Sequence, residues 1–208
     1  MQYRRIDMET YPRKKHFAYF SGMENPYVGV TVNADITGLR ELCKEKGYPF
    51  FLTLLHEVSA AANAIPEFRQ RILDGEIIEF EHCDTSHTVM HEDGTYSYCR
   101  LDCRAPLAEF LPNAKASHEY AKTHATLDDG EDGISLLFIS CLPWLSYTSF
   151  VQPTPRPADS NVRITWGKAF DRDGRTYLPV TLLAHHGLVD GVHMARFFEE
   201  LERRIAAM

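Results

Sequence analysis

The spacing of hydrophobic residues changes several times along the chain, which predicts strands and helices in mixed order. Tyr27–Asn33 alternates as a strand does. A helix follows between Asp35 as N-cap and Gly47 as stop, because apolar residues recur there at helical spacing: Ile36, Leu39, Leu42 and Cys43. Phe50–Ile65 is apolar around most of its circumference and ends at Pro66. We therefore expect a buried helix there.

The middle of the chain reads as short strands with a turn and one more helix. The expected strands are Ile77–Glu81, Thr88–His91 and Thr95–Leu101, the last two joined by a turn at Glu92–Gly94. We expect the helix within Leu107–His124.

The C-terminal third begins with three apolar segments that we interpret as strands. They are Ile134–Cys141, Val162–Phe170 and Thr176–His185, the last two joined by a turn at Asp171–Gly174. Gly191 then begins a final helix. Its expected apolar side consists of Val192, Ala195, Phe198, Leu201 and Ile205.

Helices interleaved with strands, some of them joined as hairpins, predict an α/β fold. We expect a two-layer sandwich in which helices cover a mixed β-sheet. The 208 residues have the size and composition of a single domain, 1–208. The one stretch that resembles a linker, Gln152–Asn161, contains three prolines and is expected to be a surface excursion within that domain.

Charge and cysteine content narrow the functional classes. The net charge of -7 argues against a nucleic-acid or anionic-membrane binder, and no apolar run approaches the length of a bilayer span. Five cysteines, an odd number, favour reduced thiols in a cytoplasmic protein. Neither the lone Cys99–Cys103 pair nor the spacing of the histidines at 82, 87 and 91 fits a zinc site, so we expect no metal.

Two adjacent histidines, His185 and His186, end the last long apolar strand. Adjacent side chains of a strand point to opposite faces, so both cannot serve one site. Asp190 and Gly191 follow where the final helix begins. Spacing alone leaves two interpretations about equally open: a loop that carries one functional histidine, or half-buried strand-end histidines followed by an N-cap aspartate.

Resemblance favours the first interpretation. The run His185-His186-Gly187-Leu188-Val189-Asp190-Gly191 resembles the HHxxxDG signature of CoA-dependent acyltransferases. Three further segments resemble the chloramphenicol acetyltransferase family, in the same order and at similar spacing: Tyr11–Phe17, Phe138–Trp144 and Ile164–Lys168. The likeness extends over the whole chain.

The resemblance implies roles for particular residues. His186 becomes the general base, and Asp190 becomes a structural residue in a largely buried ion pair with Arg13. Ser140 matches a hydroxyl that stabilises the oxyanion, and Thr165 matches a threonine that helps through a water molecule. A free imidazole has a pKa near 6.5, so a histidine can accept a proton from a hydroxyl at cellular pH.

Binding residues follow in the same way. Trp144 and Lys168 match positions that contact CoA, whereas Pro49 and Ala169 depart from the lysine and tyrosine common in the family. Tyr19 and Phe20 match two aromatic residues of the acceptor pocket, with the two ring types exchanged. We expect His193 to be a packed or interface residue.

The resemblance therefore implies an O-acetyltransferase that uses acetyl-CoA and acts on a small acceptor, with chloramphenicol favoured. It also implies a homotrimer with active sites between subunits. Two alternatives remain: a relative that acetylates another small hydroxyl or amine acceptor, and a catalytically silent protein that binds a small molecule on the same fold.

Overall fold

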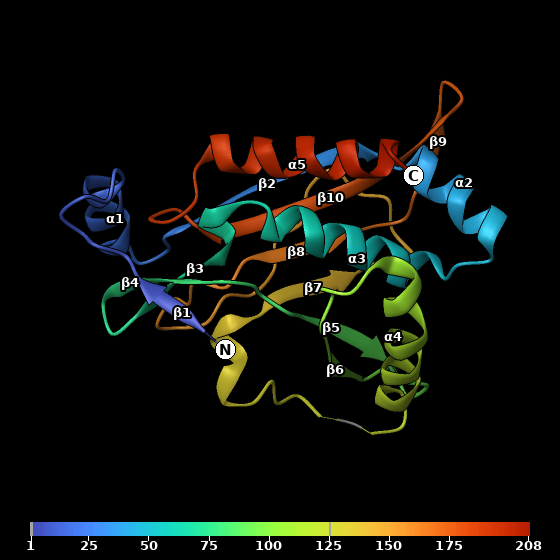
Figure 1. Ribbon diagram of the computed structural model, residues 1–208, viewed down its shortest axis with the longest axis horizontal. Helices are drawn as coiled ribbons and strands as arrows, with labels where there is room; N and C mark the ends of the chain where they lie inside the picture. Colours follow the sequence, from blue (N-terminus) through green and yellow to red (C-terminus); the bar gives the residue numbers. More distant parts are fainter. Residues whose placement is uncertain (1, 125) are drawn as a thin grey trace.

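The computed structural model describes residues 2–124 and 126–208 (Figure 1). Its helices are α1 (Lys14–Ser21), α2 (Thr37–Lys46), α3 (Phe50–Asn63), α4 (Leu107–Ala121) and α5 (Gly191–Ala206), with short 3-10 turns η1 (Pro66–Arg69) and η2 (Glu131–Ser135). Its strands are β1 (Tyr3–Arg5), β2 (Tyr27–Asp35), β3 (Gln70–Leu73), β4 (Glu76–Phe80), β5 (Thr85–Met90), β6 (Tyr96–Leu101), β7 (Leu137–Cys141), β8 (Arg163–Trp166), β9 (Phe170–Arg172) and β10 (Arg175–His185).

A mixed sheet forms the centre of the molecule. Its seven strands run in the order β2-β10-β8-β7-β5-β6, with β9 paired to β10. The β5–β7 and β7–β8 pairs are parallel and the others are antiparallel. A second, three-stranded sheet in the order β1-β4-β3 lies beside it (Figure 1).

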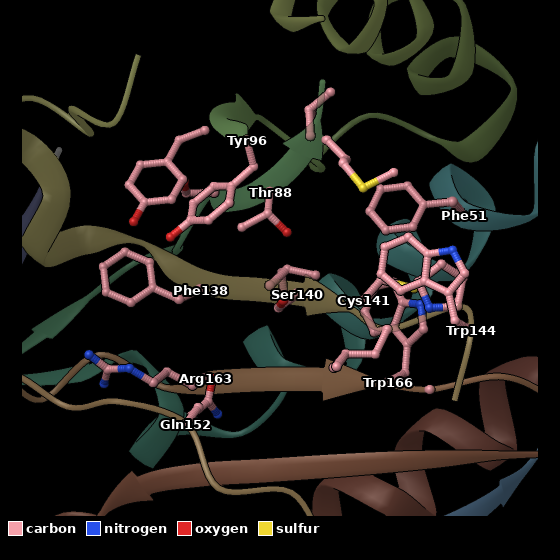
Figure 2. Close-up of a pocket in the computed structure, with 18 of the residues that line it drawn as sticks. Phe51, Thr88, Tyr96, Phe138, Ser140, Cys141, Trp144, Gln152, Arg163 and Trp166 are labelled. Atoms are coloured by element: carbon pink, nitrogen blue, oxygen red, sulfur yellow. The ribbon is translucent and has the colours of Figure 1, made fainter. Parts of the chain in front are cut away.

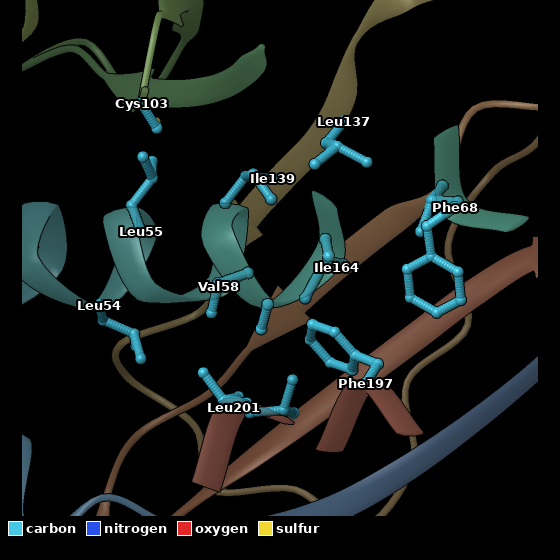
Figure 3. Close-up of a cluster of buried hydrophobic side chains, with 14 of the residues drawn as sticks. Leu54, Leu55, Val58, Phe68, Cys103, Leu137, Ile139, Ile164, Phe197 and Leu201 are labelled. Atoms are coloured by element: carbon cyan, nitrogen blue, oxygen red, sulfur yellow. The ribbon is translucent and has the colours of Figure 1, made fainter. Parts of the chain in front are cut away.

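Helices cover one face of the central sheet. Figure 1 shows α3 and α5 lying across it, with α2 and α4 toward one end. Leu54, Leu55 and Val58 of α3 pack in the core with Ile139 and Ile164 of the sheet (Figure 3). These residues are shielded from water, and because strand side chains alternate, every second strand residue faces the helices.

The predicted fold class is confirmed: the sheet is mixed and helices cover it. One of the predicted strands was wrong in its extent. The predicted strand Val162–Phe170 is two strands, β8 and β9, with the chain leaving the sheet at Gly167. A Cβ at Gly167 would lie 2.5 Å from the carbonyl oxygen of Leu145, so only glycine allows this close approach.

The predicted apolar side of the last helix was also partly wrong. Val192 and Ala195 are exposed, while Met194 and Phe197 are buried together with Phe198, Leu201 and Ile205. The stripe that starts at Met194 returns every three or four residues, so the helix is rotated relative to our expectation.

The Gln152–Asn161 stretch is not simply a surface excursion. Ser160 and Asn161 are buried, and Gln152 is half-buried against the sheet. Asn161 donates to the carbonyl oxygens of Gly133 and Leu136, which ties the end of the stretch to the chain before β7. Of the helices that the structure describes, none has the length and apolarity needed to cross a membrane.

Candidate active site

Ser140 lies on the face of the sheet opposite the helices. In β7, Leu137 and Ile139 point into the core, so the alternation directs Phe138 and Ser140 to the other face. Ser140 pairs with Thr165 of β8, and Thr165 pairs with Thr181 of β10. Paired residues on neighbouring strands share a face, so these hydroxyl side chains form a row across the sheet.

A cavity of about 900 Å³ extends past this row. One side is covered by residues 142–162, an irregular segment that we call the strap. Phe138, Tyr96, Arg163 and Gln152 lie toward one end of the cavity, and Trp144, Trp166 and Phe51 toward the other, with Ser140 between them (Figure 2). Ser140 therefore lies between the two ends of the cavity.

The residues expected to contact CoA lie at the tryptophan end. Both Trp144 and Lys168 line the cavity and are exposed at its rim. The backbone N–H of Lys168 donates to the carbonyl oxygen of Leu145 (2.7 Å), which fixes the two segments side by side. Ala169 also lines the cavity. Pro49 is the residue before α3, and its neighbour Phe50 lines the cavity.

His186 belongs to a different cluster, just beyond the end of β10. Its Nδ1 lies 2.9 Å from the carbonyl oxygen of Val189. A carbonyl oxygen can only accept, so Nδ1 carries a proton, and in the neutral ring the free lone pair is on Nε2. The ring stacks on Phe20, with centroids 3.8 Å apart. This arrangement holds the imidazole in the tautomer that a general base requires.

Arg13 fixes the loop that follows His186. One terminal nitrogen lies 3.0 Å from Asp190 Oδ2, and the other donates to the carbonyl oxygen of His186 (3.0 Å). The expected ion pair is thus formed, but it is not largely buried: the side chains of Arg13 and Asp190 are 14% and 41% exposed. The Arg13 guanidinium and the N–H of Gly191 hold the pKa of the Asp190 carboxyl below its ordinary value.

The two histidines have different surroundings. His185 is buried, and its Nδ1 accepts from the N–H of Gly187 (3.1 Å). Burial lowers the pKa of His185 to about 4, so this ring is neutral at cellular pH. His193 is buried as expected, and its Nδ1 accepts from the N–H of Asp190 (2.9 Å).

Phe20 and Tyr19 differ in their contact with His186 and in their exposure to solvent. Phe20 lies on the His186 ring, whereas the Tyr19 side chain is exposed and meets Phe20 edge-on at 5.1 Å. Within one chain, neither lines the cavity that contains Ser140. The aromatic residues that do line it, Phe51 and Phe138 among them, include several that the sequence did not single out as site residues.

Ser140 and His186 do not meet within one chain. Ser140 is two strands away from Thr181, and His186 follows Thr181 by five residues, just beyond the end of β10. With a rise of about 3.4 Å per residue and about 4.8 Å between strands, their Cα atoms are about 20 Å apart. The structure therefore separates the candidate site into a cavity with Ser140, Thr165, Trp144 and Lys168, and a cluster with His186, Phe20, Arg13 and Asp190.

Comparison with known proteins identifies the family. The family model described as chloramphenicol acetyltransferase matches residues 1–202. The chain belongs to the chloramphenicol acetyltransferase family. Chloramphenicol acetyltransferase 2 of Escherichia coli is 33% identical over 206 residues, which cover 97% of this chain and 96% of that protein. Chloramphenicol acetyltransferase of Clostridium perfringens is 29% identical, and the match covers 99% of each chain.

The structure agrees with this assignment. A solved chloramphenicol acetyltransferase superposes with a TM-score of 0.91 and 28% identity, covering 98% of this chain and 100% of the other. The family resemblance stated from the sequence is thereby confirmed over the whole chain. The roles of the individual residues rest on the geometry described above.

Proposed function

We propose that this protein transfers an acetyl group from acetyl-CoA to a hydroxyl of chloramphenicol, with His186 as the general base. Membership of the chloramphenicol acetyltransferase family supports this reaction. The observation that carries the role of His186 is the contact of Nδ1 with Val189, which directs the lone pair of the neutral ring to Nε2.

The reaction that we propose is a direct transfer. The acceptor hydroxyl oxygen bonds to the thioester carbonyl carbon while its proton passes to His186 Nε2. The negative charge that develops on the carbonyl oxygen is stabilised by the Ser140 hydroxyl, with Thr165 beside it. The C–S bond then breaks, and the departing sulfur takes the proton back from His186. Arg13 and Asp190 do not touch substrate in this scheme; they position the loop of the base.

The tryptophan end of the cavity fits the acetyl-CoA that supplies the thioester. Trp144 offers an aromatic surface, and Lys168 offers a cation at the rim where a phosphate could bind. The acceptor would then enter from the end that contains Phe138 and Tyr96, whose rings suit an aromatic molecule.

We further propose that each active site forms between two copies of the chain, in a homotrimer. His186 of one copy would approach Ser140 of its neighbour, because about 20 Å separates the two residues within one copy. A closed ring of identical contacts buries the same surface on every copy. Light scattering should accordingly return about three chain masses, and one chain mass at micromolar concentration would contradict the shared site.

An assay of thiol release tests the reaction itself. With acetyl-CoA, the protein should release free CoA only when chloramphenicol is added, and the product should be the acetylated hydroxyl. Release with other hydroxyl or amine acceptors, but not with chloramphenicol, would assign a different acceptor. Binding of CoA without release under any of these conditions would show a silent member of the family.

A further inference from the structure

Gln152 lies between two cavities and lines both of them. Phe150, Gln152 and Pro153 of the strap line both the large cavity and a second one of about 430 Å³. The second cavity lies over β2 and β10 and includes Thr181. Gln152 is therefore a polar side chain of the strap that lines both cavities and contacts the row of hydroxyl groups at Thr165.

One end of this amide lacks a partner. The Thr165 hydroxyl donates to Gln152 Oε1 over 3.4 Å. Gln152 Nε2 is buried and has no hydrogen-bond partner among residues 2–124 and 126–208. Rotating the amide by 180° would exchange Oε1 and Nε2, but one of the two atoms would still have no hydrogen-bond partner among the described residues. Buried polar groups are nearly always hydrogen-bonded, so the leftover end points to a partner that a bound molecule supplies.

The neighbouring cation does not offer the same opportunity. Figure 2 shows Arg163 beside Gln152. The terminal nitrogens of Arg163 already bond both carboxylate oxygens of Asp159 (2.8 and 2.6 Å) and the carbonyl oxygen of Asn161 (3.1 Å). The end of the cavity that contains Arg163 and Gln152 therefore favours a neutral hydrogen-bonding group over an anion.

The position of Gln152 specifies where that group would be. Gln152 bonds Thr165, which lies directly opposite Ser140 on the adjacent strand. Adjacent strands are about 4.8 Å apart, and the Gln152 amide lies one hydrogen bond beyond Thr165, so it is within reach of a small acceptor bound beside Ser140. An acceptor whose reacting hydroxyl lies at the thioester carbonyl beside Ser140 can thus place a second hydroxyl at Gln152.

We infer that Gln152 determines acceptor specificity by hydrogen bonding to the second hydroxyl of a 1,3-diol. The amide oxygen accepts a hydrogen bond from the Thr165 hydroxyl, and the amide nitrogen donates one to the acceptor. This inference rests on the proposed function, because chloramphenicol is itself a 1,3-diol. Acceptors without the second hydroxyl leave the buried amide unpartnered, and the enzyme discriminates against them for that reason.

The test compares chloramphenicol with its 1-deoxy analogue, which lacks the second hydroxyl. In Gln152→Leu, kcat/KM for chloramphenicol should fall about tenfold, the equivalent of one ordinary hydrogen bond, while kcat/KM for the analogue should not fall, because the variant has no buried amide that the analogue leaves unpartnered. Thr154→Val, on the same strap but lining only the second cavity, should keep the wild-type ratio. Gln152→Met provides an unbranched substitute if the leucine variant does not fold.

The outcomes separate this inference from the proposed function. A loss of kcat/KM of the same size for both acceptors would make Gln152 merely structural. No change in kcat/KM for either acceptor would exclude Gln152 from acceptor recognition. Either result overturns the inference while the acetyltransferase activity stands. If the wild type acetylates neither molecule, the proposed function fails and the inference fails with it.

Discussion

A mixture of two inactive variants should recover activity if the active site is shared between copies. His186→Ala removes the base and Ser140→Ala removes the oxyanion donor, so each variant alone should lose about 10²-fold or more in kcat. The two side chains lie about 20 Å apart in one chain, so no single copy can bring them together. A site composed of His186 from the serine variant and Ser140 from the histidine variant would be intact.

The fraction of wild-type activity that the mixture should recover follows from random assembly of the two variants. In a 1:1 mixture, half of the sites receive an intact His186, and independently half receive an intact Ser140, so about a quarter of the wild-type activity should return. The two variants would be unfolded together, refolded and assayed for thiol release with acetyl-CoA and chloramphenicol. Each variant refolded alone is the control. Equal activity in the mixture and in the separate variants would refute the shared site, whatever the oligomeric state.

Three further predictions concern titratable and charged residues, two of them around the base and one, His87, in β5. His185→Ala should retain activity but lose about 2 to 4 kcal/mol of unfolding free energy in urea, because it leaves a cavity and an unpartnered N–H; activity loss comparable to that of His186→Ala would contradict this. In a double-mutant cycle of Arg13→Ala and Asp190→Ala, the coupling should be only about 1 kcal/mol, since Asp190 is 41% exposed; strict additivity would mean that they do not interact. Burial, with His118 nearby, lowers the pKa of His87 from 6.5 to about 3, so the unfolded chain takes up the proton first and unfolding free energy should fall as the pH drops from 6.5 toward 3. His87→Gln should flatten that decline, and identical slopes would exclude His87 as its source.

The fold was predictable wherever a long element carried a clear pattern. The helix predicted over Phe50–Ile65 and the strand over Thr176–His185 both exist within two residues of the expected ends. The sequence did not reveal α1, because its eight residues include none that is buried. A short helix without an apolar stripe leaves no periodic signal, and its stability comes from contacts made by its ends and neighbours.

The candidate site was only partly predictable, for a similar reason. The motif around His186 singled out the base and its supporting Asp190, and the ion pair with Arg13 has formed. Its exposure could not be read from sequence, since it depends on how residues 177 positions apart pack. Gln152 gave no signal at all, because a glutamine in a proline-rich stretch resembles any solvent-exposed one until the strap is folded onto the sheet.

The order of strands in the central sheet has a consequence for biosynthesis. β2 forms near the start of the chain, yet its partner is β10, which pairs Tyr27 with His185 and Asp35 with Tyr177. At about 5 to 20 residues per second, a ribosome needs roughly 10 to 30 s to make the intervening chain. Throughout that time the backbone N–H and C=O groups of residues 27–35 lack their strand partner, and such groups can pair with another chain and cause aggregation. A chain truncated before β10 would leave both β2 and β8 without the strand that joins them, so the central sheet cannot close until the C-terminal part of the chain has been made.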